Sequence, residues 1–291
     1  MMITDLSTHA FRGLTDQQLN FSPGFNVFVG QNGSGKTSVL EGLHYVCTQK
    51  SFRTSKPAYL IQEGKDQLTL RAGFSIDEQV EKVAYQRDRA GNKHFHRQKD
   101  VEASFVDWAR LVPVLFMDTA SHRALAEVPA LRRHMIDWTL FYLKPAYALD
   151  WKRFQRILKQ RNAALKTDDS SLDYWDNALV EAASVLDDAR MHGCAALESE
   201  LQALLVAHHA LGVVRLVYDR GWAKNQTYVS VLKKNRQRDQ ASGYTHWGPH
   251  RADIQILCDG VLAHQRLSQG QMKMLHMMLR LAQHCQVLSA S

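Results

Sequence analysis

The sequence has few of the features that mark secreted, membrane-spanning or metal-bound proteins. Its 291 residues include only four cysteines, which lie far apart and form no C-x-x-C pair, so neither a zinc ribbon nor a small disulfide scaffold is expected. The longest uninterrupted apolar run, Leu111–Met117, is far too short to cross a membrane. Asp5 and Arg12 interrupt the N-terminus, which lacks a signal peptide's apolar stretch. These absences predict a cytoplasmic protein with no membrane partner.

The composition is that of an ordinary globular protein. Apolar residues make up 45% and charged residues 22% of the chain, and its length suggests two domains, or one domain with an insertion. Lysine and arginine outnumber aspartate and glutamate by 36 to 29, which gives a net charge of +7. A basic surplus of this size is compatible with a nucleic-acid partner but does not require one.

The pattern along the chain predicts α/β segments on both sides of a helical insertion. Alternating or apolar runs predict two strands around the Pro23-Gly24 turn, the second of them at 25–30. Further strands are predicted at 67–76, at 80–88, after a turn at 90–92, and at 111–117. Residues 130–211 have helical spacing, with a helix starting near Leu172. Strands return at 213–222 and before an Asp259-Gly260 hairpin turn. The expected domains are 1–128, 129–240 and 241–291.

A glycine-rich segment, GQNGSGKTS, carries the strongest functional signal. It matches the phosphate-loop pattern G-x-x-x-x-G-K-[ST], between an expected strand and an expected helix. Glycines let backbone N–H groups converge on a phosphate, Lys36 reaches the β- and γ-phosphates, and the Thr37 hydroxyl coordinates Mg²⁺. The predicted ATP and Mg²⁺ site consists of Gly30, Gln31, Asn32, Gly33, Ser34, Gly35, Lys36 and Thr37. The inner side of the helix is predicted to carry Val39, Leu40, Leu43 and Val46.

A second anion site is expected at LSQGQ, residues 267–271, just before a predicted helix at 272–288. Ser268 is a good N-cap residue, and Gly270 permits close backbone approach. Together with the phosphate loop, this segment resembles the signature of ABC-type ATPases, with Gln269 at the first glycine position of L-S-G-G-Q. The resemblance implies that Ser268, Gly270 and Gln271 meet the γ-phosphate held by a second copy of the chain, so that ATP binding drives formation of a homodimer.

Further motifs narrow the resemblance to the RecF family of bacterial recombination mediators, which are related to SMC proteins. They occur in family order over nearly the whole chain: SPGFNVFVGQNGSGKTSVLE (22–41), SFR (51–53), RR..MIDW (132–138), LKQRNAAL (158–165), GPHRAD (248–253) and LSQGQMKML (267–275). The resemblance implies an α/β fold of the ABC/SMC head type, with a P-loop and a compact helical arm. Arg12 lies where this family has a basic residue near the nucleotide.

The resemblance also implies a function and partners. Members bind single-stranded, duplex and gapped DNA, dimerise with ATP, and act in DNA replication and repair with RecR and RecO to load RecA. Where ABC relatives often have a Mg²⁺-contacting glutamine, this sequence has none: either Asp118 serves in its place or the Mg²⁺ site is weakened.

Two basic clusters are candidate DNA contacts, because duplex binding is mostly neutralisation of phosphates by lysine and arginine. Lys152, Arg153, Arg156, Lys159 and Arg161 fall on one predicted helix, and Lys152, Arg156 and Lys159 share a face. Lys233, Lys234, Arg236 and Arg238 form the second cluster. Either could equally be a solvated helix face. The nearby aromatic residues Trp138, Phe141 and Tyr142, and the methionines of 272–278, are expected to be core.

ATP hydrolysis in this architecture also needs an apolar strand that ends in acidic residues, and the sequence has no Asp or Glu after Asp259. We therefore expect this chain to be a C-terminally shortened form that binds ATP but hardly hydrolyses it, and no catalytic residue is assigned. The alternative is a non-hydrolysing module that binds DNA or a protein partner.

Overall fold

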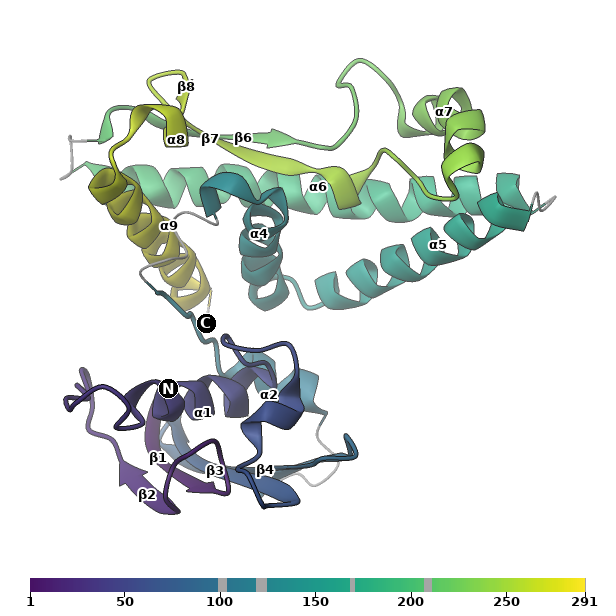
Figure 1. The fold of residues 1–291 in the computed structure, drawn as a ribbon. Helices are drawn as coiled ribbons and strands as arrows, with labels where there is room; N and C mark the ends of the chain where they lie inside the picture. Colours follow the sequence, from purple (N-terminus) through teal and green to yellow (C-terminus); the bar gives the residue numbers. More distant parts are fainter. Residues whose placement is uncertain (99–103, 119–124, 168–170, 207–210, 291) are drawn as a thin grey trace. The chain divides into compact units, whose positions relative to one another are not determined.

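A computed structural model describes residues 1–98, 104–118, 125–167, 171–206 and 211–290 (Figure 1). The chain divides into two compact units: unit 1, Met1–Phe116, and unit 2, Met117–Ser291. No described helix is both long and apolar enough to span a membrane.

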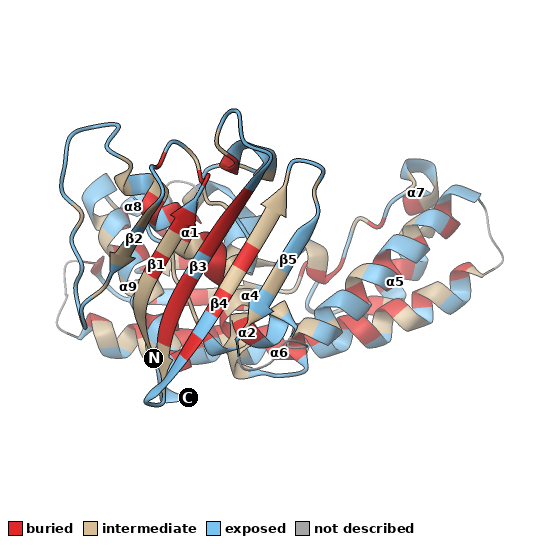
Figure 2. Cartoon of the chain, turned by 90° about the horizontal axis from the view of Figure 1, so that it is seen from below, coloured by how far each residue is buried: buried red, intermediate tan, exposed pale blue. Residues whose placement is uncertain are grey.

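Unit 1 is built on a five-stranded antiparallel sheet. Its strands are β1 (Met2–His9), β2 (Gln17–Asn20), β3 (Gln67–Ile76), β4 (Gln79–Asp88) and β5 (Lys93–Arg97), in the order β2-β1-β3-β4-β5. Figure 2 shows that β3, in the centre, is the most buried strand, whereas the edge strand β5 is largely exposed. The sequence predicts β2 to β5 but not β1.

Helices α1 (Lys36–Thr48) and α2 (Phe105–Leu111) pack with this sheet around one apolar core, and the short 3-10 helix η1 spans Pro57–Leu60. The indole of Trp108 is fully buried, lies edge-on to Phe74 at 4.9 Å between ring centroids, and donates to the Val46 carbonyl. Val39 and Val46 of α1 are buried as predicted, and Leu43 packs against the core. Leu40 is exposed, so its predicted place on the inner side is wrong.

Two predicted strands of unit 1 are absent. Residues 25–30 are irregular, and no described strand pairs with them; Phe25, Val27 and Val29 are exposed by 101%, 81% and 86%. The segment Leu111–Met117 is also irregular, with α2 ending at Leu111. Alternation favours a strand only if a neighbouring strand supplies the hydrogen bonds, and for these segments the described residues supply none.

Unit 2 contains the predicted helical region and the strands that follow it. Its helices are α4 (Pro129–Leu143), α5 (Tyr147–Thr167), α6 (Leu172–Leu205), α7 (Tyr228–Ser242), α8 (Ala263–Arg266) and α9 (Gln269–Ser289), with the 3-10 helix η3 at Pro249–Arg251. Strands β6 (Val214–Asp219), β7 (Asp253–Cys258) and β8 (Val261–Leu262) form an antiparallel sheet. The β7–β8 hairpin turns at Asp259-Gly260, as predicted, and both residues have positive φ.

The 34-residue helix α6 is the axis of unit 2 (Figure 1). It contacts α4, α5, α7, α9 and β6, and it buries one continuous apolar face. The residues on this face fall at the predicted helical spacing: Trp175, Leu179, Ala182, Leu186 and Ala189. Residues 241–291 share a core with the helices of 129–240. The division into domains 1–128, 129–240 and 241–291 stays a prediction.

Several aromatic and methionine residues are less buried than expected. Trp138, Phe141 and Tyr142 are only partly buried and pack on one another, with ring centroids 4.7 Å apart for Trp138–Tyr142. On α9, Met272 is buried, but Met277 is 52% exposed, so the expectation that all four methionines are core is wrong.

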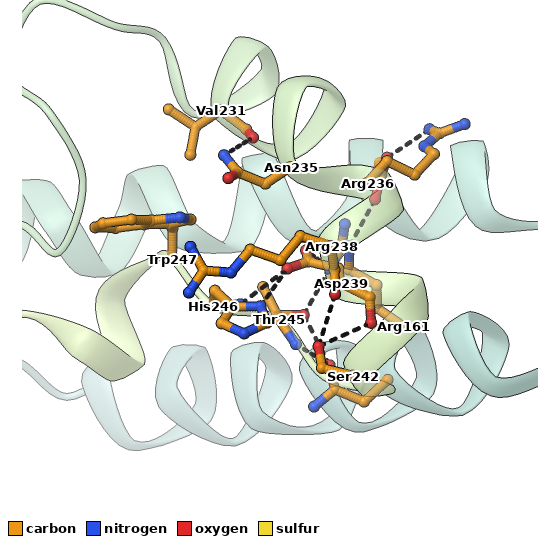
Figure 3. Close-up of polar contacts among 12 residues, drawn as sticks. Arg161, Val231, Asn235, Arg236, Arg238, Asp239, Ser242, Thr245, His246 and Trp247 are labelled. Atoms are coloured by element: carbon orange, nitrogen blue, oxygen red, sulfur yellow. Dashed lines mark hydrogen bonds and ion pairs between the residues drawn. The ribbon is translucent and has the colours of Figure 1, made fainter.

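Arginine–carboxylate pairs join distant parts of unit 2. Arg161 of α5 is fully buried; its guanidinium donates to Asp176 of α6 at 2.6 Å and to Asp239 of α7 at 2.8 Å (Figure 3). It also donates to the Thr245 hydroxyl. Grouping Arg161 with the exposed basic cluster is therefore wrong. Because a lone buried guanidinium is very unfavourable, its two carboxylate partners fix how α5, α6 and α7 pack.

Two further arginines act in the same way. Arg190 of α6 forms a bidentate salt bridge with Asp137 of α4 and donates to the carbonyl of Pro249. Arg132 of α4 forms a bidentate salt bridge with Asp253, the first residue of β7. Both donor–acceptor distances are 2.8 Å. The motifs RR..MIDW, LKQRNAAL and GPHRAD thus supply at least one partner of each pair: Arg132 and Asp137, Arg161, and Asp253.

All four cysteines are free thiols. Cys47, Cys194 and Cys258 are buried, and burial raises the pKa of Cys47 to about 12. Cys285 near the end of α9 is partly exposed.

Replacing Arg161 with alanine should destabilise the protein by about 3–5 kcal/mol, because it leaves buried carboxylates without their cation. Arg153→Ala is the matched control on the same helix, since Arg153 is exposed and pairs only with exposed Glu181. The control should change the free energy of unfolding by less than about 0.5 kcal/mol. Urea unfolding followed by circular dichroism would measure both, and equal effects would contradict the assigned role.

Stability should fall on acidification because of His250. Burial lowers its pKa to about 4, although its Nε2 lies 2.9 Å from the Thr245 carbonyl and gains from that bond. The charges facing it are Arg133, Arg251 and Asp239. The pKa of His250 is near 6.5 in the unfolded chain and near 4 in the folded protein. At pH values between these two, the unfolded chain binds one more proton than the folded protein, so unfolding becomes easier as pH falls.

Between pH 7 and pH 4.5 the wild type should lose about 2 kcal/mol more than His250→Gln, which keeps an amide donor but cannot titrate. Denaturant titrations of both proteins at the two pH values give this difference. Equal losses of unfolding free energy in the two proteins would show that the fold does not hold the His250 imidazole neutral.

Candidate functional site

The phosphate loop connects irregular residues 25–29 to helix α1 in unit 1. Gly33 and Gly35 have φ values of +86° and +91°, a region that other residues rarely adopt. A Cβ atom at Gly35 would also lie 2.5 Å from Cδ2 of Leu14. The sequence therefore needs glycine at this position both for its backbone conformation and for its packing.

The start of α1 presents donors suited to an anion. Gly35 is its N-cap residue and provides no side-chain cap, and the N–H of Val39 donates to the Gly35 carbonyl at 3.0 Å. Residues 31–34 and Thr37 are exposed. Nζ of Lys36 lies over the loop, donating to the carbonyls of Gly30 and Gln31 at 2.8 Å each. Backbone donors, a lysine and a threonine hydroxyl fit the requirements of a triphosphate with Mg²⁺.

A buried ion cluster anchors the middle of α1. Glu41 is fully buried and accepts two hydrogen bonds from Arg12, at 2.6 and 2.9 Å, one from the Ser51 hydroxyl and one from Arg53. Burial would raise the pKa of Glu41, but the hydrogen bonds of Arg12 and Ser51 outweigh it and lower the pKa below its usual value. Arg12 also donates to the Tyr59 carbonyl. This arrangement explains the SFR motif; a contact of Arg12 with the nucleotide stays a prediction.

The LSQGQ segment lies in unit 2 and forms a capped helix start. Ser268 Oγ accepts from the backbone N–H of Gln271, and Gln271 Oε1 accepts from the N–H of Ser268, so the two residues cap α9 reciprocally. The N-cap role predicted for Ser268 is confirmed, although α9 begins at Gln269 rather than Met272. Ser268 and Gly270 are exposed.

The two basic clusters lie on neighbouring helices of unit 2. Lys152, Arg156 and Lys159 are exposed on α5, while Phe154, Ile157 and Leu158 face the core. On α7, Lys233 and Lys234 are exposed, but the Arg236 guanidinium donates to both Asp173 and Asp176. Arg236 therefore has less positive charge to offer a phosphate than its position in the sequence suggests.

Sequence reasoning did not identify the arginine–carboxylate partners. Their signal is present: Arg161 and Asn162 belong to LKQRNAAL, and Asn162 Oδ1 accepts from the backbone and hydroxyl of Thr245. Partners so far away along the chain cannot be assigned from helical spacing.

Comparison with known proteins gives consistent results. A family model described as an AAA domain matches residues 5–176. The DNA replication and repair protein RecF of Aliivibrio fischeri (strain MJ11) is 34% identical over 290 residues, covering 97% of this chain and 80% of the relative. RecF of Coxiella burnetii is 34% identical over 287 residues, covering 97% and 79%.

The fold also matches solved structures. A RecF–ATP structure from the RecFOR pathway superposes with a TM-score of 0.86 at 22% identity, covering 97% of this chain and 80% of that one. An SMC head bound to the C-terminal winged-helix domain of ScpA gives a TM-score of 0.53 at 15% identity, covering 99% and 77%. The expected α/β P-loop ATPase fold of the RecF and SMC heads is thereby confirmed. On its sequence similarity to these relatives, the chain belongs to the RecF family of DNA replication and repair proteins.

Proposed function

We propose that this chain is an ATP-dependent DNA-binding protein of replication and recombinational repair, which dimerises with ATP and helps to load RecA. The observation that carries the proposal is the phosphate loop at the start of α1, in a chain of the RecF family. Its DNA substrates would be single-stranded, duplex and gapped DNA.

ATP would be bound by residues 30–37. The uncapped first turn of α1 attracts the phosphates, and Lys36 would exchange its bonds to the Gly30 and Gln31 carbonyls for bonds to the β- and γ-phosphates. The exposed hydroxyl of Thr37 is the proposed ligand of Mg²⁺. Because phosphate oxygens carry more negative charge than peptide carbonyls, the exchange favours the nucleotide.

Dimerisation would use the exposed start of α9. The backbone N–H groups there and the positive end of a 21-residue helix favour an anion. We propose that Ser268, Gly270 and Gln271 meet the γ-phosphate bound by a second copy. An ATP molecule shared by two copies would make the dimer depend on the nucleotide.

DNA binding would use the basic surface of unit 2. Lys152, Arg156 and Lys159 project from one side of α5, and Lys233 and Lys234 project from α7. None of these five lysines and arginines forms an ion pair within the part of the chain that the structure describes, so their charges are free to neutralise phosphates. Arg236, the remaining candidate DNA contact, is only partly exposed.

RecR and RecO are the proposed protein partners, with RecA acted on through them. A solved RecF of similar fold is described as a recombination mediator in the RecFOR pathway, which supports this assignment. The alternative, a module that binds DNA passively, is favoured by one observation: the candidate DNA contacts lie in unit 2, while the phosphate loop lies in unit 1.

Replacing Lys36 with alanine should weaken ATP binding roughly 10- to 100-fold, because a charge-assisted bond to phosphate is lost. Lys50→Ala is the matched control: Lys50 is an exposed lysine just past the other end of α1, and its loss should change affinity less than twofold. Titration with a fluorescent ATP analogue measures both variants. Equal affinities would refute the nucleotide site.

The same variants separate the two functions. If ATP gates DNA binding, Lys36→Ala should abolish the effect of ATP on DNA affinity, whereas a passive module should bind DNA equally well with either lysine variant.

Replacing Ser268 with aspartate should abolish ATP-dependent dimerisation while leaving α9 intact. Aspartate caps helices as well as serine does, but it places a negative charge where the partner's γ-phosphate is proposed to lie. Ser268→Thr keeps the cap without the charge and should dimerise. Light scattering with a non-hydrolysable ATP analogue would report the mass, and normal dimerisation of Ser268→Asp would contradict the proposed contact.

A further inference from the structure

Unit 2 contains a cavity that shares only Arg238 with the two basic clusters. Its volume is about 770 Å³, and it lies where β6, the loop after it, the end of α7 and the loop before η3 come together. Three cations line it, Lys224, Arg238 and Arg251, against one carboxylate, Asp219. None of the three cations forms an ion pair with any described carboxylate.

Aromatic side chains line the same cavity. Trp247 is 40% exposed, and its backbone is held by the Tyr228 hydroxyl, which donates to the Trp247 carbonyl at 2.8 Å. Figure 3 shows the Arg238 side chain extending towards the Trp247 ring, beside His246. Trp222 is only 6% exposed and stacks on Tyr228, with 4.6 Å between ring centroids. An indole that is partly open to solvent and close to cations is a common platform for a nucleobase.

The cavity is held in shape by its backbone. Gly248 N–H donates to the Gly221 carbonyl, and a Cβ atom at Gly221 would lie 2.3 Å from the Gly248 carbonyl oxygen. The two loops that carry Trp222 and Trp247 therefore touch each other closely. His246 is fixed by Asp239, the same carboxylate that pairs with Arg161. The loops are thus tied to the buried ion pairs of unit 2.

Two polar groups of the lining residues, the Tyr218 hydroxyl and Nε1 of Trp222, lack a hydrogen-bond partner in the described part of the chain. Nε1 of Trp222 is buried, and no acceptor lies within hydrogen-bond distance of it among the described residues. An unpaired buried N–H group costs about 1–3 kcal/mol, which the packing around Trp222 must offset.

We propose that this cavity binds a short stretch of single-stranded DNA, with one base on the Trp247 ring and the adjoining phosphates on Arg238, Arg251 and Lys224. The volume suits one or two nucleotides, the excess of cations suits phosphates, and the exposed indole of Trp247 suits a base. A rigid duplex keeps its bases stacked inside and has no base to place on the indole. The inference rests on the proposed DNA-binding function and adds a separate contact for single strands.

The test compares two substrates by fluorescence anisotropy on the full chain: labelled oligothymidine and a duplex of similar length. Trp247→Ala should weaken binding of the single strand about tenfold and leave duplex binding within about twofold, whereas Trp247→Phe should retain most of the affinity. Arg238→Ala should weaken binding of the single strand. It should also make the plot of log affinity against log salt concentration less steep by about 0.7. Lys50→Ala, at an exposed lysine of unit 1 outside the proposed DNA-binding surface, is the matched charge control for the single-strand measurement.

The outcomes are separable. If Trp247→Ala and Arg238→Ala bind oligothymidine as tightly as the wild type while the duplex still binds, the cavity proposal is wrong and the proposed function stands. If the wild type binds neither DNA, the proposed function itself fails. Crosslinking of a 5-iodouracil oligonucleotide to Trp247 would support the assignment directly. Binding of polyglutamate but not oligothymidine, lost in Trp247→Ala, would overturn it in favour of an acidic protein partner.

Discussion

The architecture of unit 2 depends on three arginines that pair with carboxylates of other elements. A guanidinium out of water is stabilised by carboxylates in good geometry, and Arg132, Arg161 and Arg190 each have such partners. Their partners come from α4, α6, α7 and β7, so the helices have few alternative ways to pack. Apolar burial along α6 supplies the bulk of the stabilisation, and the ion pairs determine which arrangement it takes.

The two units contribute different chemistry to the proposed function. Unit 1 provides a helix start that is left uncapped, with glycines keeping its backbone open and the Glu41 cluster anchoring the helix behind it. Unit 2 provides a helix start that is fully capped by Ser268 and Gln271, together with surfaces rich in lysine and arginine. The first suits a tightly held phosphate, and the second suits contacts that form only when a nucleotide or a nucleic acid arrives.

Much of this could be predicted from the sequence, because local patterns determine it. The phosphate loop, the cap at Ser268, the hairpin at Asp259-Gly260 and the apolar face of α6 all depend on residues within a turn or two of each other. The failures involve distant partners. Residues 25–30 alternate as a strand does, yet pairing cannot be seen in a single segment, and Arg161 looks like its exposed neighbours until Asp176 and Asp239 are brought beside it. The cavity lined by Trp222 and Trp247 is formed by four separate segments, so no local sequence motif predicts it.

The distribution of the thiols has a practical consequence. Three of the four cysteines are buried, and burial keeps the thiol of Cys47 in its unreactive protonated form at neutral pH. Cys285 is the one with an accessible surface. This chain therefore offers a single preferred position for a maleimide dye or spin label, near the end of α9, without any of its four cysteines having to be removed. Such a label would report on α9, which Ser268 caps at its other end, and its environment could be followed while nucleotide and DNA are added.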